Sequence, residues 1–240
     1  MKNAETPLEK KQRHSSLGFY SSIVTAVLSV ITLALAVTTP PLSGPFCTGS
    51  CFEYPYLDIA ERFPRDYYWM YPAIVLSCTY LIMMLSLYHT ATNRKKVYSL
   101  VGSAFAMMSA LLLSVDYFVQ VTVIPPSTLA GETDGLSLLT QFNPHGLFIA
   151  LEEIGYLFLV LSFIFIIPLF EGKKALEKSV RWISIIGLLL TVITFALITA
   201  EFGIEREYRF EVGIISIAYL ELIPLSILLA RYFGRRQVHS

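Results

Sequence analysis

The chain has 240 residues, of which 55% are hydrophobic and 15% are charged, and its formal net charge is zero. This balance of charge argues against a nucleic-acid partner, because binding to nucleic acid requires a strongly basic face. The hydrophobic residues are gathered into long runs, which excludes an ordinary soluble domain and predicts an all-α membrane protein.

Six apolar runs predict a bundle of six transmembrane helices, in a single membrane domain that covers residues 1–240. Each run is close to or above the roughly 20 residues that a helix needs to cross the hydrocarbon layer. The expected spans are residues 19–39, 68–88, 97–123, 144–170, 180–200 and 210–232. The polar segment 1–17 shows no helical periodicity, and we expect it to lie outside the bundle.

The distribution of charge predicts the orientation of this bundle. Fourteen of the 18 Lys and Arg residues lie in the two tails and in the connections 89–96 and 171–181. The other three connections hold most of the acidic residues, Glu211 among them. By the positive-inside rule, both termini of this multi-pass protein are expected to be cytoplasmic, with the bundle in the cell membrane. The basic turns are also expected to contact anionic membrane lipid.

The connection 40–67 is the longest one on the predicted outer side. Apolar residues at helical spacing between its prolines predict a short amphipathic helix at the membrane surface. Cys47 and Cys51 lie in the same connection, in the segment CTGSC. They are expected to form a disulfide if the compartment is oxidising, since a metal site would need further Cys or His residues nearby. No metal site is predicted.

The fourth run begins with a helix-start signal, Asn143 followed by Pro144. Asn is a preferred N-cap residue, and Pro is preferred at the first helical position. The next residue, His145, lies at the outer mouth of the predicted bundle. It is expected either to sit at the interface or to relay protons or complete a metal site.

Four acidic residues lie in the interior of the apolar runs, away from their first and last residues: Asp116, Glu152, Glu153 and Glu221. With a rise of 1.5 Å per residue, all four are expected to lie ~12–15 Å below the outer surface. The only Lys or Arg residues inside these six runs are Arg181 and Arg231 at their inner ends, so none is placed to neutralise the acids within the bilayer. A carboxyl without a cationic partner in a medium of low dielectric remains protonated or holds a bound cation.

Helical spacing indicates which side chains accompany these acids. Asp116 and Gln120 are four residues apart, as are Glu152 and Tyr156, so each pair shares one helix face. Glu152 and Glu153 are separated by ~100° around the helix and cannot point the same way. Aromatic walls that would favour an amine-bearing ligand through cation–π contacts are expected from Tyr117, Phe118, Tyr156 and Tyr219.

The sequence therefore predicts an outward-facing acidic cavity that binds or transports a cation, a proton or a small amphiphilic ligand. The candidate binding residues are Asp116, Gln120, Asn143, His145, Glu152, Glu153, Tyr156 and Glu221. One alternative is an intramembrane lipid-modifying enzyme that uses carboxyls as acid and base. Another is a structural or regulatory subunit in which the carboxyls bond only across helices. The sequence leaves open the cofactor and the oligomeric state, a homo-oligomer included.

Two segments carry a resemblance to other proteins. NPHGLFIALEEIGYLF, from Asn143 to Phe158, and EYRFEV, from Glu207 to Val212, resemble segments of uncharacterised prokaryotic six-span integral membrane proteins. The resemblance implies a six-span helical fold for the second half of the chain, and it implies no particular activity.

Overall fold

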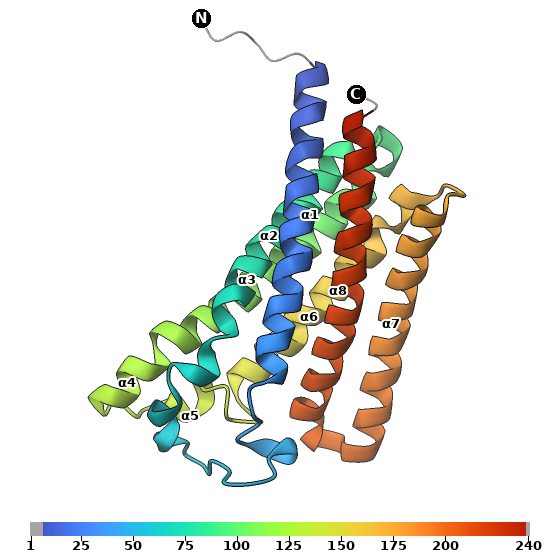
Figure 1. The fold of residues 1–240 in the computed structure, drawn as a ribbon. Coiled ribbons are helices and arrows are strands. Elements are labelled where there is room, and N and C mark those ends of the chain that lie inside the picture. The colour runs from blue at the N-terminus through green and yellow to red at the C-terminus, as the bar shows by residue number, and fades with distance from the viewer. Residues whose placement is uncertain (1–6, 239–240) are drawn as a thin grey trace, which may run out of the picture.

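The computed structural model describes residues 7–238 of the chain, and the side chains of residues 12–237. Within these residues the fold is all-α, without a β-strand, as predicted (Figure 1). The α-helices are α1 (Pro7–Val37), α2 (Met70–Thr90), α3 (Lys96–Thr122), α4 (Ile124–Ala130), α5 (Leu136–Leu139), α6 (Leu147–Ile166), α7 (Ala175–Phe202) and α8 (Glu207–Val238). Short 3-10 helices are η1 (Gly44–Phe46), η2 (Leu57–Arg62), η3 (Arg65–Tyr67), η4 (Asn93–Lys95), η5 (Ile167–Phe170) and η6 (Gly203–Arg206).

Helical stretches long and apolar enough to cross a membrane number five among the described residues, which indicates a membrane protein. They are Gln12–Val37, Arg65–Thr90, Asn93–Ala130, Leu147–Phe170 and Ala175–Gln237. The last of these contains both α7 and α8. These two helices are joined by η6 and pack side by side (Figure 1).

Two boundaries differ from those expected. The segment predicted to lie outside the bundle is helical from Pro7 onward, as the first turns of α1, whereas Lys2 of the basic tail lies outside the described residues. Packing explains this helix, since Ser15 Oγ donates a hydrogen bond to the carbonyl oxygen of Phe233 in α8. The helical stretch that holds the third run continues beyond residue 123, because α4 follows α3 directly. Pro125 lies in the first turn of α4, where a helix needs no N–H donor from it.

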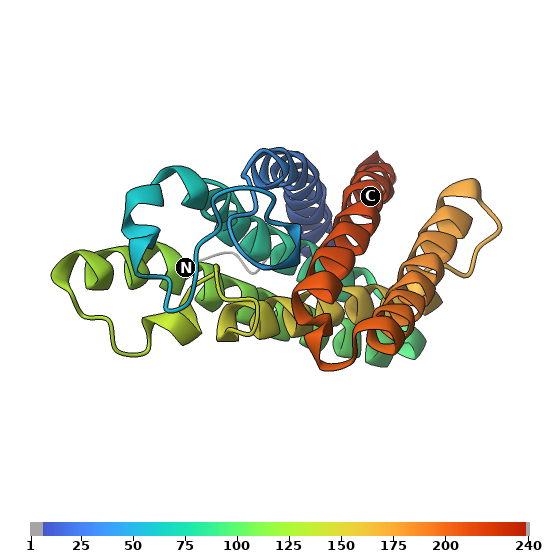
Figure 2. The ribbon, with the colours of Figure 1, turned by 90° about the horizontal axis from the view of Figure 1, so that it is seen from below.

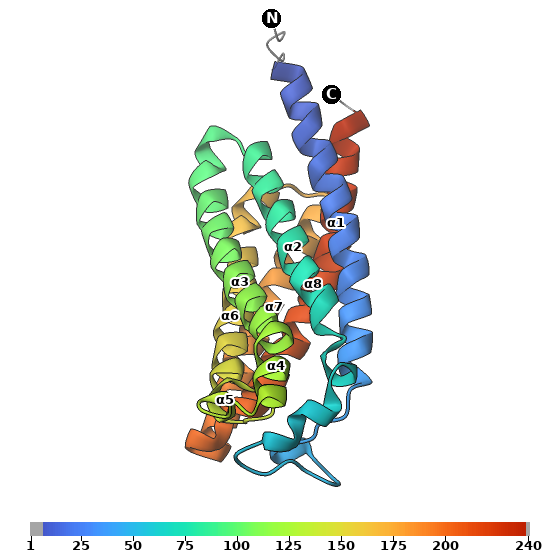
Figure 3. The ribbon, with the colours of Figure 1, turned by 90° about the vertical axis from the view of Figure 1, so that its left-hand side faces the viewer.

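Five long helices form a ring in which each packs against the next, in the order α1, α2, α3, α6, α8 and back to α1. Helix α7 lies outside this ring and packs against α6 and α8 (Figures 1 and 3). Glycines bring α3 and α6 close together. A Cβ at Gly102 would lie 3.0 Å from the carbonyl oxygen of Ser162, and one at Gly155 would lie 2.7 Å from Leu113.

The basic turns meet at one end of the molecule, together with the start of α1 and the end of α8 (Figures 1 and 3). Lys95 in η4 forms an ion pair with Glu171 after η5, at 2.8 Å. Arg236 of α8 donates a hydrogen bond to the carbonyl oxygen of Thr90 at the end of α2. We call this end the basic end.

The opposite end carries η1, η2, η3, α4 and α5 (Figure 2). The connection from α1 to α2 contains the six-residue 3-10 helix η2 where a short amphipathic helix is expected, with Ile59 buried. Asp66 is also buried and accepts a hydrogen bond from Arg62 Nε at 2.7 Å. This ion pair holds the chain at the point where it enters α2.

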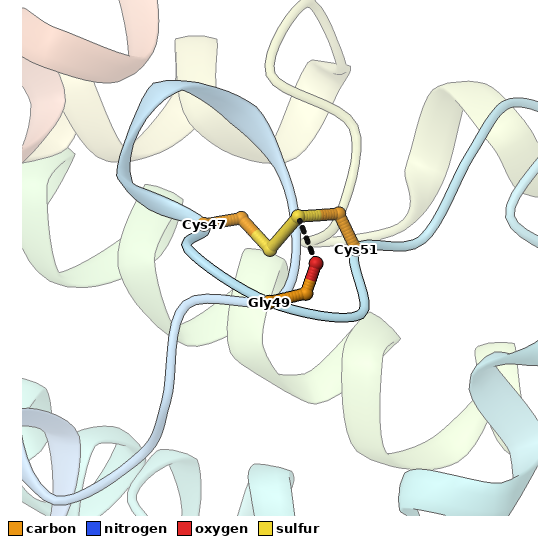
Figure 4. Close-up of a disulfide and its surroundings, with 3 residues drawn as sticks. All are labelled: Cys47, Gly49 and Cys51. Atoms are coloured by element: carbon orange, nitrogen blue, oxygen red, sulfur yellow. Dashed lines mark hydrogen bonds between the residues drawn. A yellow bond between two sulfur atoms is a disulfide. The ribbon is translucent and has the colours of Figure 1, made fainter.

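The two cysteines of this connection form a disulfide, with an S–S distance of 2.05 Å (Figure 4). The bridge closes the short segment from Cys47 to Cys51, and Cys51 Sγ lies 3.3 Å from the carbonyl oxygen of Gly49. In this state neither sulfur is available as a metal ligand. The loop after α1 is therefore covalently closed between Cys47 and Cys51.

Candidate functional site

A pocket of about 280 Å³ lies inside the ring, near the end opposite to the basic end. Its walls come from the last turns of α1, the segment 39–43, Trp69, the segment 141–142, α6 and the first half of α8. The lining side chains that carry polar groups include Glu152, Tyr156, Tyr208, Glu211 and Tyr219. We call it the Glu152 pocket.

Glu152 on α6 is 1% exposed and is held by tyrosines. Tyr117 of α3 donates a hydrogen bond to Glu152 Oε1 at 2.6 Å, and the hydroxyls of Tyr117 and Tyr156 are 2.8 Å apart. Since Tyr117 has one hydroxyl hydrogen, Tyr156 must be the donor in its bond to Tyr117. Tyr156 lies one turn after Glu152 on the same face of α6, as the spacing predicts. The hydroxyls thus form a directed chain that ends on the Glu152 carboxyl.

Gly155 explains how α3 supplies one of these tyrosines. The absence of a side chain at this position leaves room for Leu113 of α3, whose Cδ2 would lie 2.7 Å from a Cβ there. Tyr117 follows Leu113 by one helical turn on the same face. The close contact between the two helices therefore brings the Tyr117 hydroxyl to Glu152.

A second carboxyl of the pocket, Glu211, was expected on the outer surface but is 5% exposed. The side chains of Glu152 and Glu211 lie within hydrogen-bonding contact, and Glu211 Oε2 has no partner in the described part of the chain. Two carboxyls can share a hydrogen bond only when at least one is protonated. The pair therefore carries at most one negative charge while this contact exists.

The sequence contains a pattern that predicts burial of Glu211, although the charged residues around it indicate an exposed turn. The buried residues Ile214, Ala218 and Leu222 of α8 follow one another at spacings of four. Extending this pattern backward by three residues reaches Glu211. Its burial follows from helical periodicity, whereas its neighbours Glu207 and Arg209 suggested a solvated turn.

Aromatic rings form much of the remaining wall. Trp69, Phe148, Tyr156, Tyr208 and Tyr219 line the pocket. Trp69 packs edge-on against Tyr117, with ring centroids 5.1 Å apart. Phe118, expected to be part of this wall, is instead 57% exposed on the outside of α3. The rotation of α3 that turns Tyr117 inward carries its neighbour outward.

The pocket has a cover and an opening. Gly44, in the loop after α1, has a φ of 67°, and a Cβ on it would lie 2.9 Å from the ring of Tyr208, so glycine lets this loop lie close to the pocket. Val37, Val212 and Ser216 line the pocket and are also exposed on the outside of the bundle. The pocket therefore opens sideways, between the end of α1 and the first turns of α8.

Asp116 and Gln120 share one buried face of α3, but neither lines the pocket. Asp116 interacts electrostatically with Glu152, and its Oδ2 has no partner among the described residues. Gln120 donates to the carbonyl oxygen of Leu139 and accepts a hydrogen bond from the N–H of Gln141 at 3.0 Å. Gln120 thus ties α3 to the segment between α5 and α6.

The expectation that no positive side chain contacts the four acids within the spans is wrong for Glu153. This residue does not line the pocket and forms an ion pair with Arg206 of η6 at 3.3 Å. The Arg206 guanidinium also lies over the ring of Phe195, 4.8 Å from its centroid. Arg206 lies outside the predicted spans and reaches Glu153 from the turn between α7 and α8.

Glu221 does not share a chamber with the other acids, contrary to the expected constellation. Its carboxyl lies against Gly187 of α7, where a Cβ would meet Oε2 at 2.5 Å. It is 2% exposed, and neither of its oxygens has a partner in the described structure. Equal depth in the bilayer was predicted, but the rotation of α8 points Glu221 toward α7 instead of toward Glu152.

Asn143 and His145 lie at the mouth of the bundle but outside the pocket. Helix α6 begins at Leu147 with Gly146 as its N-cap, so the prediction that Asn143 caps this helix is wrong. Asn143 stabilises the preceding turn, because Nδ2 donates to the carbonyl oxygen of Ser137 and Oδ1 accepts from the N–H of His145. The His145 side chain is largely exposed, with Nδ1 3.4 Å from a Glu207 oxygen.

Two features of the composition of the site bear on its chemistry. The residues that line the Glu152 pocket include no Lys, Arg or His. Among residues 7–238, no group of three or more His, Cys, Asp or Glu side chains is arranged to hold a metal ion. The site thus combines two carboxyls, phenol hydroxyls and aromatic faces, a set of groups that suits a positively charged organic group.

Comparison of the chain with models of protein families, with curated proteins and with solved structures finds no match. The resemblance to six-span prokaryotic membrane proteins therefore stays a prediction.

Proposed function

We propose that this chain is a membrane protein whose Glu152 pocket binds a small amphiphile with one positive charge. The observation that carries the proposal is that Glu152 and Glu211 face one aromatic pocket that no cationic side chain lines. A ligand ammonium would replace the shared proton and leave both carboxylates hydrogen-bonded to it. The rings of Trp69, Tyr156 and Tyr219 provide faces for cation–π contact.

Size and access favour an amphiphile over a bare ion. The volume of about 280 Å³ is just below the range of ~300–1,000 Å³ for pockets that take drug-sized molecules, so it suits a small organic group. The opening beside Val212 and Ser216 lies in the first three turns of α8, on a surface that we assign to lipid. An amphiphile partitioned into the outer leaflet would enter by this route with its charged group foremost.

We assign six membrane spans and a cytoplasmic location to both termini. Two observations support this assignment: α7 and α8 are each long enough to span and pack side by side, and the basic turns share an end with the start of α1 and the end of α8. Fusions of a fluorescent protein, which matures only in the cytoplasm, to each terminus should both fluoresce in bacteria. A dark fusion at one terminus only would establish an odd number of spans.

Binding of tryptamine, compared with uncharged 3-ethylindole of nearly the same shape, tests the proposed site. Purified protein should show a saturable rise in melting temperature with tryptamine that diminishes at acid pH, because protonation removes the negative charge of the carboxyls. In Glu152→Gln or Glu211→Gln the Kd should increase roughly 10- to 100-fold, since a hydrogen bond to a charged group is worth about 1.5–3 kcal/mol.

Glu153→Gln is the matched control, because this neighbouring carboxyl does not line the pocket and pairs with Arg206. Equal responses to tryptamine and 3-ethylindole, or equal loss of binding in all three variants, would contradict a cation site at Glu152. Absence of any saturable response to a panel of aryl and alkyl amines would also reject the proposal.

One alternative is an enzyme that modifies a lipid. The contact between the Glu152 and Glu211 carboxyls supports it, since a protonated and an ionised carboxyl side by side can act as acid and base, and the pocket is open toward lipid. Incubation with a lipid extract followed by mass spectrometry should then reveal product that Glu152→Gln does not form. The structural-subunit alternative expects carboxyls that bond only across helices, and the pocket beside these acids favours ligand binding over it.

A further inference from the structure

A second hollow follows the Glu152 pocket toward the basic end, on the outside of the bundle, where α1 and α8 run side by side (Figure 1). Its volume is about 730 Å³. The lining residues are Phe19, Ile23, Ala26, Val27, Val30, Ile31, Ile223, Ile227, Ala230, Arg231, Gly234 and Arg235. We call it the α1–α8 groove.

Small residues in the groove walls and contacts between the two helices create this hollow. A Cβ at Gly18 would meet the ring of Phe233 at 2.5 Å, so α1 and α8 touch closely at this point. Ala26, Ala230 and Gly234 leave a trough above this contact line because their side chains are small or absent. Val27 and Ile227, on its rims, are exposed on the outside of the bundle. The trough therefore faces the lipid.

Charge is confined to one end of the groove. Arg231 and Arg235 lie one turn apart on α8, near the basic end, and every other lining residue is apolar or glycine. Both guanidinium groups are exposed, and among the described residues neither forms a hydrogen bond or an ion pair. Arg236, in contrast, donates to the carbonyl oxygen of Thr90 and lies over the ring of Tyr232. Two arginines are thus left available beside an apolar trough.

The length of the groove matches one leaflet of a bilayer. From Ile223 to Arg235 the helix rises ~18 Å, at 1.5 Å per residue. Half of a hydrocarbon core of about 30 Å is ~15 Å, so a groove that begins at the mid-plane brings these arginines to the level of the phosphate groups. Guanidinium groups bind phosphate through paired hydrogen bonds.

We propose that the α1–α8 groove binds one anionic phospholipid of the leaflet at the basic end, with its phosphate on Arg231 and Arg235 and an acyl chain in the trough. Charge complementarity selects this occupant over a neutral lipid, and the apolar trough selects it over free phosphate. A second copy of the chain packed symmetrically on this groove would bring its own two arginines toward Arg231 and Arg235, and like charges would repel.

Native mass spectrometry of the detergent-purified chain, titrated with phosphatidylglycerol or with phosphatidylcholine of the same acyl chains, tests the proposal. The first phosphatidylglycerol should bind roughly 10-fold or more tightly than phosphatidylcholine, given the attraction of two arginines for an anionic headgroup. The double variant Arg231→Gln/Arg235→Gln should lose this preference. Arg236→Gln should keep it, because Arg236 is engaged with Thr90 and does not line the groove.

Two further measurements test the acyl-chain part of the site. The substitution Ala26→Trp fills the trough and should weaken binding of the first phosphatidylglycerol molecule roughly 10-fold. Leu100→Trp, on the exposed face of α3, is the control and should leave this binding unchanged. Inorganic phosphate at the same concentration should displace no lipid. An unchanged preference in the double arginine variant, displacement by phosphate, or loss of a dimer without loss of lipid in Ala26→Trp would each overturn the proposal. If Ala26→Trp does not fold, the preference of the double arginine variant for phosphatidylglycerol decides whether the proposal holds.

Discussion

Tyr117 donates its hydroxyl hydrogen to Glu152 across 2.6 Å, from α3 to α6. The same oxygen lies 2.8 Å from the Tyr156 hydroxyl, so the Tyr117 phenol links Glu152 and Tyr156, which both line the pocket. The bond holds Oε1 of the Glu152 carboxyl against α3, while the same side chain lines the pocket together with Glu211. Orientation of this carboxyl is therefore a property of the α3–α6 contact.

Replacement Tyr117→Phe should test this dependence. It leaves a buried acceptor without its donor, a loss of about 1–3 kcal/mol in the free energy of unfolding. Tyr117 is 1% exposed, so the ring itself should still fit. The melting temperature in detergent should fall, and tryptamine should bind more weakly. Tyr20→Phe, on the exposed face of α1, is the control and should change neither quantity.

Gly187 should be sensitive to the addition of a single methyl group. A Cβ at this position would lie 2.5 Å from Glu221 Oε2, so Gly187→Ala should destabilise the chain by about 1–3 kcal/mol despite the better helix propensity of Ala. In the double variant Gly187→Ala/Glu221→Ala most of this loss should be recovered, because the clashing carboxyl is gone. A thermodynamic cycle of thermal melts measures the coupling. Additive effects would show that Glu221 does not determine the requirement for glycine.

The ion pair between Glu153 and Arg206 should contribute little to stability. Both side chains are partly exposed, at 14% and 27%, and pairs of this kind are worth about 0–1 kcal/mol. Glu153→Gln and Arg206→Gln should each shift the melting temperature slightly, and the shift should shrink in high salt. A loss of tryptamine binding in Glu153→Gln as large as that in Glu152→Gln would contradict the assignment of the cation site to Glu152 and Glu211.

The disulfide predicts a simple count of thiols. The chain contains 3 Cys, and Cys47 and Cys51 are bonded. Denatured protein that has not been reduced should therefore take up one thiol label, at Cys78, and reduced protein should take up three. Closing so short a segment stabilises the fold by about 2 kcal/mol in the chain-entropy account. Cys47→Ser/Cys51→Ser should therefore lower the melting temperature without abolishing folding, and unchanged label uptake on reduction would exclude the bridge.

Much of the architecture could be predicted from the sequence because its causes are local. A run of apolar residues of sufficient length forms a helix wherever lipid leaves the backbone no other hydrogen-bonding partner, and this rule locates α2, α3, α6, α7 and α8 to within a few residues. The spacing of four that places Tyr156 beside Glu152 is also local, since it depends on the helical repeat alone.

The partner of each buried acid, in contrast, was decided by tertiary structure. The sequence established that Asp116, Glu152, Glu153 and Glu221 lie within apolar runs, but the rotation of each helix and the identity of its neighbour depend on packing across the bundle. That packing turns Glu221 toward Gly187, brings Arg206 to Glu153 and places Glu211 beside Glu152. Depth along a helix follows from counting residues, whereas direction around it follows from long-range contacts such as that of Gly155 with Leu113.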